Sequence, residues 1–129
     1  MEKTIREASI TSDEFFSGII AGLSYYGVEK FRIDDGLHKA MVEVLAIHDR
    51  ATMLFILKLN PYGLSHGVEA GFSNAHTRGL IYYRSPFDGN AYIRIRYDSA
   101  VAILDGLPGG RDLYLNLVDE LLDKSITIS

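Results

Sequence analysis

Apolar residues recur at three- and four-residue spacing after a polar start to the chain. Thr11 and Glu14 have the spacing of a capping box, in which each side chain satisfies a free backbone amide at the first turn of a helix. The apolar positions that follow are Phe15, Phe16, Ile19, Ile20, Leu23 and Tyr26. Gly27 then offers the left-handed residue that ends many helices. The pattern predicts an amphipathic helix over residues 12–26.

The next stretch alternates apolar and polar residues, and then becomes ambiguous. Residues 28–34 predict a short strand that ends at Asp34-Asp35-Gly36. Residues 37–48 place their apolar side chains within an arc of about 140° on a helical wheel, which favours a helix capped by Asp34 or Asp35. The alternative is a hairpin turn at Asp35-Gly36 followed by a strand over residues 41–47, which residues 48–51 turn back onto a strand over residues 52–59. Residues 52–59 are expected to be a strand in both cases, ended by Asn60-Pro61.

A glycine-rich segment and a hairpin follow. Residues 60–79 predict a loop with a short helical stretch near residues 68–75. The hairpin begins at Leu80, ends at Tyr97 and turns at Asp88-Gly89. With those two loop residues, the facing pairs are Tyr83 with Arg94, Ile81 with Arg96, and Ser85 with Tyr92. The apolar side of this hairpin would carry Leu80, Tyr82, Ile93 and Ile95.

Two helices are expected in the last third of the chain. Asp98 and Ser99 are candidate caps for a short helix that ends near Leu104. A longer helix with a broad apolar side follows Gly110, and residues 125–129 are either an edge strand or a frayed end. The whole order predicts one α+β domain with a mostly antiparallel sheet, covered by amphipathic helices from the two ends of the chain.

Under the hairpin alternative for residues 37–48, this layout resembles the compact acidic chaperones of bacterial secretion systems. That resemblance implies a small dimer with a twisted antiparallel sheet and helices on one side. It rests on the order of elements, because no motif accompanies it.

The amino-acid composition and the net charge exclude several classes of site. The 129 residues are 47% apolar and contain no cysteine, which excludes disulfides, thiolate metal sites and a cysteine nucleophile. The net charge of −4 argues against general affinity for nucleic acid. Residues 76–97 are the exception, with four basic side chains and one acidic. No secretory leader or membrane-spanning run is present in the pattern, so a cytoplasmic location without membrane contact is expected.

Three groups of residues are candidate sites, although no catalytic signature is present. His66, Asn74, His76 and Arg78 lie in the glycine-rich segment and combine a titrating imidazole with a cation that grips anions. The second group is Gly109-Gly110-Arg111, where free backbone amides at a helix start favour anion binding. The third is an interaction face that comprises Tyr83, Tyr92, Arg94 and Arg96. Most of these side chains also have ordinary structural explanations as caps, connectors and a solvated sheet face.

Three functions remain open from the sequence. The leading hypothesis is a non-catalytic binding module, adaptor- or chaperone-like, that self-associates as a dimer and has a possible protein partner, because 14 of its residues are Tyr or Phe. The first alternative is a small enzyme on an anionic metabolite that uses His66 or His76 with Arg78 or Arg111. The second alternative is weak single-stranded nucleic-acid binding through the Tyr83, Tyr92, Arg94 and Arg96 face. No cofactor or metal is expected.

Overall fold

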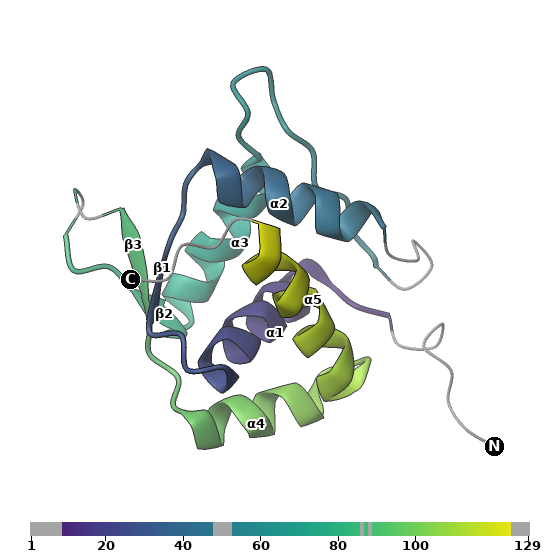
Figure 1. Ribbon diagram of the computed structural model, residues 1–129, viewed down its shortest axis with the longest axis vertical. Helices are drawn as coiled ribbons and strands as arrows, with labels where there is room; N and C mark the ends of the chain where they lie inside the picture. Colours follow the sequence, from purple (N-terminus) through teal and green to yellow (C-terminus); the bar gives the residue numbers. More distant parts are fainter. Residues whose placement is uncertain (1–8, 48–52, 86, 88, 125–129) are drawn as a thin grey trace.

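α1 (Ser12–Tyr25) lies at the centre of the protein, and three other helices pack on it (Figure 1). The computed structural model describes residues 9–47, 53–85, 87 and 89–124. Within these ranges the chain is one α+β domain of five helices and one three-stranded antiparallel sheet. The other elements are β1 (Lys30–Arg32), α2 (Asp35–Ala46), α3 (His66–Thr77), β2 (Ile81–Tyr82), β3 (Asn90–Ile93), α4 (Tyr97–Gly106) and α5 (Gly110–Lys124).

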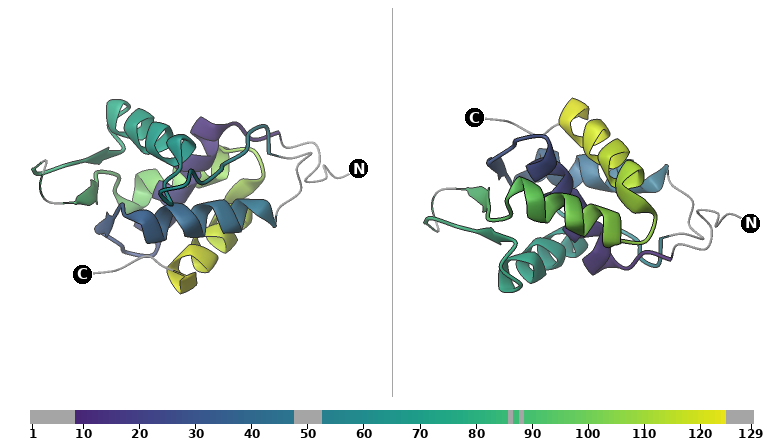
Figure 2. Two further views of the ribbon diagram at one scale, coloured as in Figure 1. Left: turned by 90° about the horizontal axis from the view of Figure 1, so that it is seen from above. Right: turned by 90° about the horizontal axis from the view of Figure 1, so that it is seen from below.

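The sheet lies to one side of the helices, and β2 and β3 extend away from them (Figure 2). No helix in the described ranges is both long enough and apolar enough to cross a membrane.

The start of α1 confirms the capping box. The Glu14 amide donates to Thr11 Oγ1 at 3.2 Å, and the Thr11 amide donates to Glu14 Oε1 at 2.9 Å. Two glycines of α1, Gly18 and Gly22, lie against Tyr114 and Val118 of α5. Because glycine has no side chain, the two helices approach closely along this line.

Residues 37–48 are helical over the part that the structure describes, so the hairpin alternative is wrong. Asp34 caps α2, since its Oδ1 accepts from the Leu37 amide at 2.9 Å. The stripe Leu37, Ala40, Met41, Val44 and Leu45 is buried, as the helical spacing predicts. The resemblance to secretion chaperones depended on the hairpin and loses its basis.

α3 is longer than the short helical stretch expected in the glycine-rich segment. Ser65 caps it, with its Oγ accepting from the Val68 amide at 3.2 Å. Gly71 lowers the local helix propensity, but a Cβ at this position would overlap the ring of Phe16. The glycine is therefore explained by close packing of α3 on α1 and does not mark a loop.

Residues 53–59 are not a strand, contrary to expectation. They form one isolated bridge, between Met53 and Ile10, with the Leu54 amide donating to the Ile10 carbonyl at 2.9 Å. The alternation is nevertheless visible in burial: Met53 and Leu57 are buried, whereas Leu54 and Ile56 are exposed. The sequence pattern of a strand is present without strands beside it.

β3 is the central strand of the sheet, in the order β1-β3-β2. Ala91 is paired with Phe31, and Ile93 with Ile81, on the side that faces the core. The opposite side therefore carries the alternate residues of all three strands. Within the strands they are Lys30, Arg32, Tyr82, Asn90 and Tyr92. Arg84 and Arg94 lie just beyond β2 and β3, with their guanidinium groups over the same two tyrosine rings.

The observed pairing of β2 with β3 differs from the pairing that a two-residue turn at Asp88-Gly89 predicts. Tyr82 is paired with Tyr92, so the connection is longer and the pairing is shifted by three residues. An odd shift moves one strand's side chains to the other face, which is why Tyr82 lies outside with Tyr92 and Ile81 lies inside. β3 must also pair with β1, and this second partner fixes its register. Asp88 of the predicted turn lies outside the described residues. The predicted edge strand or frayed end at residues 125–129 also lies outside them.

α4 begins two residues earlier than a cap at Asp98 predicts, and it has no side-chain cap. Its N-cap residue is Arg96, and it runs two residues beyond Leu104. α5 begins at Gly110 as expected and buries Tyr114, Leu117, Val118 and Leu121. α5 thus covers the core with one side, as its amphipathic pattern indicates, whereas α1 is buried along residues 15–24 and is itself part of the core.

Candidate functional site

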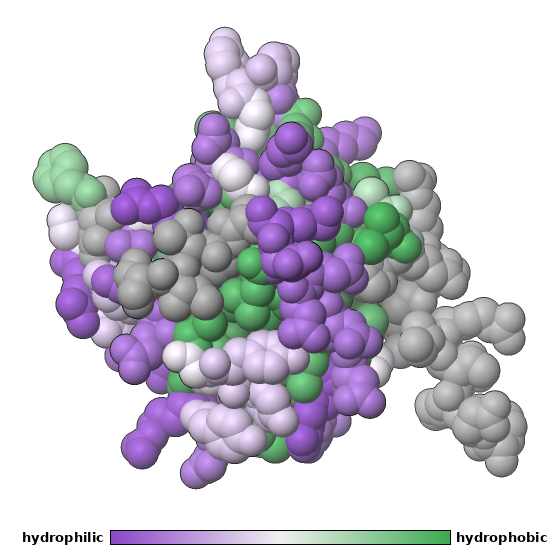
Figure 3. All heavy atoms as spheres, viewed as in Figure 1, coloured by the Kyte–Doolittle hydropathy of each residue, from purple (hydrophilic) through white to green (hydrophobic). Residues whose placement is uncertain are grey.

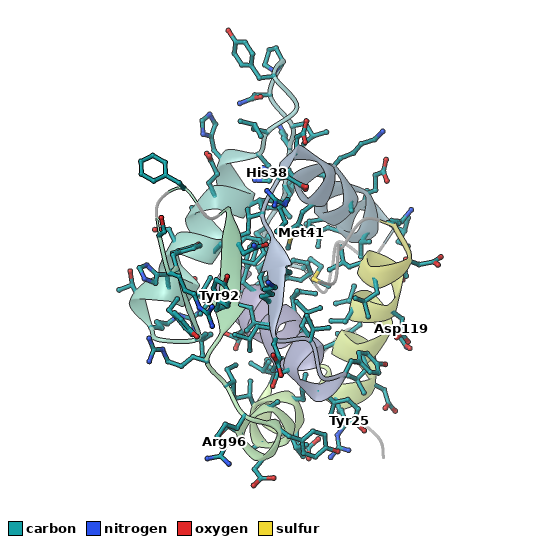
Figure 4. All side chains as sticks on the ribbon, turned by 60° about the vertical axis from the view of Figure 1, so that its left-hand side comes forward. Tyr25, His38, Met41, Tyr92, Arg96 and Asp119 are labelled. Carbon is teal, nitrogen blue, oxygen red and sulfur yellow. The ribbon has the colours of Figure 1, made fainter. Side chains whose placement is uncertain are left out.

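The outer side of the sheet gathers cations and tyrosines. We call Lys30, Arg32, Tyr82, Arg84, Tyr92 and Arg94 the basic face; Tyr92 is labelled in Figure 4. The rings of Tyr82 and Tyr92 are stacked, with centroids 5.4 Å apart. The face contains two members of the predicted interaction face, Tyr92 and Arg94.

Cations cover the stacked tyrosines. The Arg84 guanidinium lies 4.3 Å from the centroid of the Tyr92 ring, and the Arg94 guanidinium lies 4.8 Å from that of Tyr82. Lys30 Nζ is 5.8 Å from the Tyr92 centroid. As a result Tyr92 is only 8% exposed. The side chains that a partner meets first on this face are therefore the cations, and each contact adds about 0.5–1 kcal/mol to the sheet.

The remaining members of the predicted interaction face lie elsewhere. Tyr83 packs against His76 of α3, with ring centroids 4.9 Å apart, and burial raises the pKa of its phenol. Arg96 lies at the start of α4 (Figure 4). The register shift brings Tyr82 and Arg84 to the outer side in place of Tyr83. Arg96 leaves the face for a different reason, because β3 ends at Ile93 and α4 begins directly after Arg96.

His76 and Tyr83 line a pocket at the end of the sheet. Its volume is about 570 Å³, and its walls are Ile33, His76, Tyr83, Arg84, Ser85 and Gly89. Arg84 belongs both to this pocket and to the basic face. The pocket and the face are thus one continuous surface.

Arg78 is held by protein groups of its own chain. Its Nε donates to Asn74 Oδ1 at 2.6 Å, its Nη1 to Ser17 Oγ at 2.8 Å, and its Nη2 to the Asp13 carbonyl at 3.4 Å. These contacts connect the end of α3 to α1. Arg78 and Asn74 were candidate ligand-binding residues; the structure places them in this helix-to-helix contact.

Arg78→Gln is expected to lower the free energy of unfolding by about 1 kcal/mol, because the hydrogen bonds to Ser17 and Asp13 are lost. Arg96→Gln is the matched control, since it removes the same charge where no side-chain cap bond is made. Urea unfolding followed by circular dichroism measures both. Equal stability of the two variants would contradict the structural role of Arg78.

Arg111 is paired with a carboxylate. Its Nε and Nη2 donate to the two oxygens of Asp105 at 2.9 and 2.8 Å, and this bidentate contact lowers the pKa of Asp105. Gly109 and Gly110 both have positive φ, at 92° and 77°. Gly110 also donates its amide to the Leu107 carbonyl at 3.1 Å. This turn therefore serves as a connector whose cation already has an anionic partner.

The groups of the enzyme alternative are spread over the protein. His66 and His76 are at opposite ends of α3, roughly 15 Å apart along the helix axis. His66 is exposed and its Nδ1 is 3.6 Å from Glu69. Proton transfer needs hydrogen-bond reach between the groups that share the chemistry. The two histidines therefore cannot serve one site, and both arginines are already bonded to groups of the chain: Arg78 to Asn74 and Ser17, and Arg111 to Asp105.

His38 is a buried polar residue that the sequence interpretation counted in neither a site nor the core. Its Nδ1 accepts from the Ser65 amide at 2.8 Å, which ties the first turn of α2 to the cap of α3 (Figure 4). Burial lowers the pKa of His38, against the opposing effect of Glu69, Asp34 and Asp35. The signal in the sequence was its position, three residues before Met41 and seven before Leu45, on the margin of the apolar stripe.

A second surface is apolar. Ile47 at the end of α2 is 67% exposed, and Leu54 and Ile56 are 60% and 63% exposed. Figure 3 shows apolar surface where α2 ends. A small cavity of about 80 Å³ lies between α2 and residues 53–57. Within the described residues, the backbone of residues 53–59 makes a single hydrogen bond, from the Leu54 amide.

Comparison with protein-family models, curated proteins and solved structures finds no match to this chain.

Proposed function

We propose that the protein is a non-catalytic binding module that self-associates through residues 53–59 and the adjoining end of α2. The observation that carries the proposal is an alternating segment whose outward apolar residues are exposed and whose backbone makes one hydrogen bond to the part of the chain that the structure describes. Leu54 and Ile56, together with Ile47, form the exposed row. A segment of this kind is a template for pairing with another strand.

A second copy of the same chain can pair with this segment without bringing like charges together. An antiparallel pair centred on Ile56 sets Leu54 of each copy opposite Lys58 of the other. The two Ile56 side chains then meet at the two-fold axis, and the two lysines are kept apart, each beside an apolar Leu54. A two-fold contact uses the same patch on both copies, so one segment supplies both halves of the interface.

Ile56→Lys tests this interface, because it places like charges opposite each other at the two-fold axis. We expect the wild type to have twice the 14.4 kDa mass of one chain, and the variant to dissociate more than about tenfold more readily. Size-exclusion chromatography with light scattering, over a range of concentrations, gives both values. Ile56 is 63% exposed, so folding itself should change by less than about 0.5 kcal/mol.

Tyr62→Ser is the matched control, since Tyr62 is 85% exposed and outside the segment. It should leave the mass unchanged. A wild type that stays at the mass of one chain at every concentration contradicts self-association, and an Ile56→Lys protein that remains a dimer contradicts this interface.

A further inference from the structure

Four cations lie on the outer side of the sheet of an otherwise acidic chain. The net charge is −4, yet the basic face carries Lys30, Arg32, Arg84 and Arg94. Among the residues that the structure describes, none of these four has a carboxylate within ion-pair distance. A cation–π contact holds a guanidinium over a ring without cancelling its charge. The face therefore attracts an anionic partner.

The tyrosines hold two guanidinium groups in fixed positions. Arg84 lies over Tyr92 and Arg94 over Tyr82, at 4.3 and 4.8 Å from the ring centroids. A guanidinium has a planar fork of donors that matches two oxygens of a phosphate. Because the planes are already ordered, less side-chain entropy is lost when an anion binds. The basic face is in this sense prepared for phosphate groups.

The adjoining pocket distinguishes among anionic partners. Its volume of about 570 Å³ lies within the range of about 300–1,000 Å³ typical of ligand pockets. His76 and Tyr83 give it aromatic walls, and Ser85 and Arg84 give it polar groups. A ligand that puts a phosphate on Arg84 can therefore put a planar ring in the pocket. An acidic peptide supplies the charge but has no such ring beside each anion.

We propose that the basic face and this pocket bind single-stranded nucleic acid. Lys30, Arg32, Arg84 and Arg94 contact phosphates, and one unpaired base enters the pocket and packs against Tyr83, whose ring is in edge contact with His76. A duplex keeps its bases stacked and paired, whereas a single strand can turn a base outward onto an aromatic side chain. This surface is separate from residues 53–59, so the proposal does not depend on self-association.

Fluorescence anisotropy with a labelled single-stranded oligonucleotide of mixed sequence tests the phosphate contacts. With four cations engaged, the logarithm of the affinity should fall with the logarithm of salt concentration at a slope of about −2.8, since each neutralised phosphate contributes about 0.7. The Arg84→Gln, Arg94→Gln double variant should bind about tenfold more weakly or worse, with the slope reduced in size by about 1.4. Circular dichroism at the assay temperature confirms that each variant is folded.

Tyr83→Leu tests the pocket separately. It should lower the affinity by about 5- to 100-fold, the range expected when one stacked base is lost, and leave the salt slope unchanged. The Lys39→Gln, Lys124→Gln double variant removes two charges away from the face and should keep the wild-type slope. Equal binding of a duplex of the same sequence or of polyglutamate, or unchanged binding by the Arg84→Gln, Arg94→Gln protein, would overturn the proposal.

Discussion

Gly18→Ala is expected to lower the free energy of unfolding by about 2 kcal/mol, although alanine is the better helix former. A Cβ at Gly18 would overlap one edge of the Tyr114 ring, at Cγ, Cδ1 and Cε1. Tyr114 is fully buried, and its hydroxyl donates to the Pro108 carbonyl at 2.7 Å. The ring therefore cannot swing away, and α1 and α5 must separate. Urea unfolding at constant pH measures the change.

Gly106→Ala is the control for helix propensity. Gly106 is the last residue of α4, and a Cβ there would meet no atom within 4 Å. This variant should be neutral or more stable by up to about 1 kcal/mol. Gly22→Ala, whose Cβ would lie 2.6 Å from Val118 Cγ2, should fall between the two. A Gly18→Ala protein as stable as Gly106→Ala would show that the helices do not pack at this line.

A double-mutant cycle isolates the contact. Tyr114→Ala is itself destabilising, because it removes a large buried ring and its hydrogen bond. In that background Gly18→Ala should cost less than in the wild type, since the atoms it would strike are gone. The difference is the coupling between the two positions, and residues in contact typically show about 0.5–3 kcal/mol.

The helices could be predicted from the sequence because each has a local cause. The capping box of α1, the Asp34 cap and apolar stripe of α2, and the Gly110 start of α5 are all set by neighbouring residues. α3 was underestimated because Gly71 weakens the local signal. Its reason is a tertiary contact, the ring of Phe16, which no window of sequence contains.

The candidate surfaces were predicted only in part. The basic face depends on the register between β2 and β3, and the surface at residues 53–59 depends on which strands lie beside that segment. Tyr92 and Arg94 were placed on an exposed face, but the partner strand was three residues out of register, so Tyr83 stood where Tyr82 and Arg84 lie. Residues 53–59 have a strand pattern, and only the structure shows that no strand pairs with them within the described residues. The partner of Arg111 is Asp105, six residues earlier at the end of α4, and the sequence alone does not show that the turn brings the two side chains together.

His38→Leu is expected to lower the free energy of unfolding at pH 7.5 by about 1–3 kcal/mol, because the buried Ser65 amide loses its acceptor. Both residues are buried, at 3% and 0% exposure, so water cannot replace the imidazole. Ser65 also caps α3, and its side chain bonds to the Val68 amide. The loss should therefore loosen the start of α3 and be visible as faster amide hydrogen exchange at Ser65.

The same residue should make wild-type stability fall in acid. Burial lowers the pKa of His38 in the folded state, whereas the unfolded imidazole titrates near about 6.5. Below that value the unfolded chain binds the extra proton more readily, so stability that is complete above about pH 6.5 is lost as the pH falls towards the folded pKa. A protonated Nδ1 also cannot accept from Ser65.

Three variants separate the hydrogen bond from the charge. His38→Asn keeps an acceptor for the Ser65 amide without a group that titrates, so it should recover part of the stability at pH 7.5 and remove the His38 contribution to the acid loss. His66→Gln, at an exposed imidazole, should retain the wild-type pH dependence. Urea unfolding between about pH 5 and pH 7.5 measures all of them. If the free energy of unfolding falls in acid by the same amount in both His38 variants as in the wild type, another group causes the fall. The contact between His38 and Ser65 would then have no role in the pH dependence.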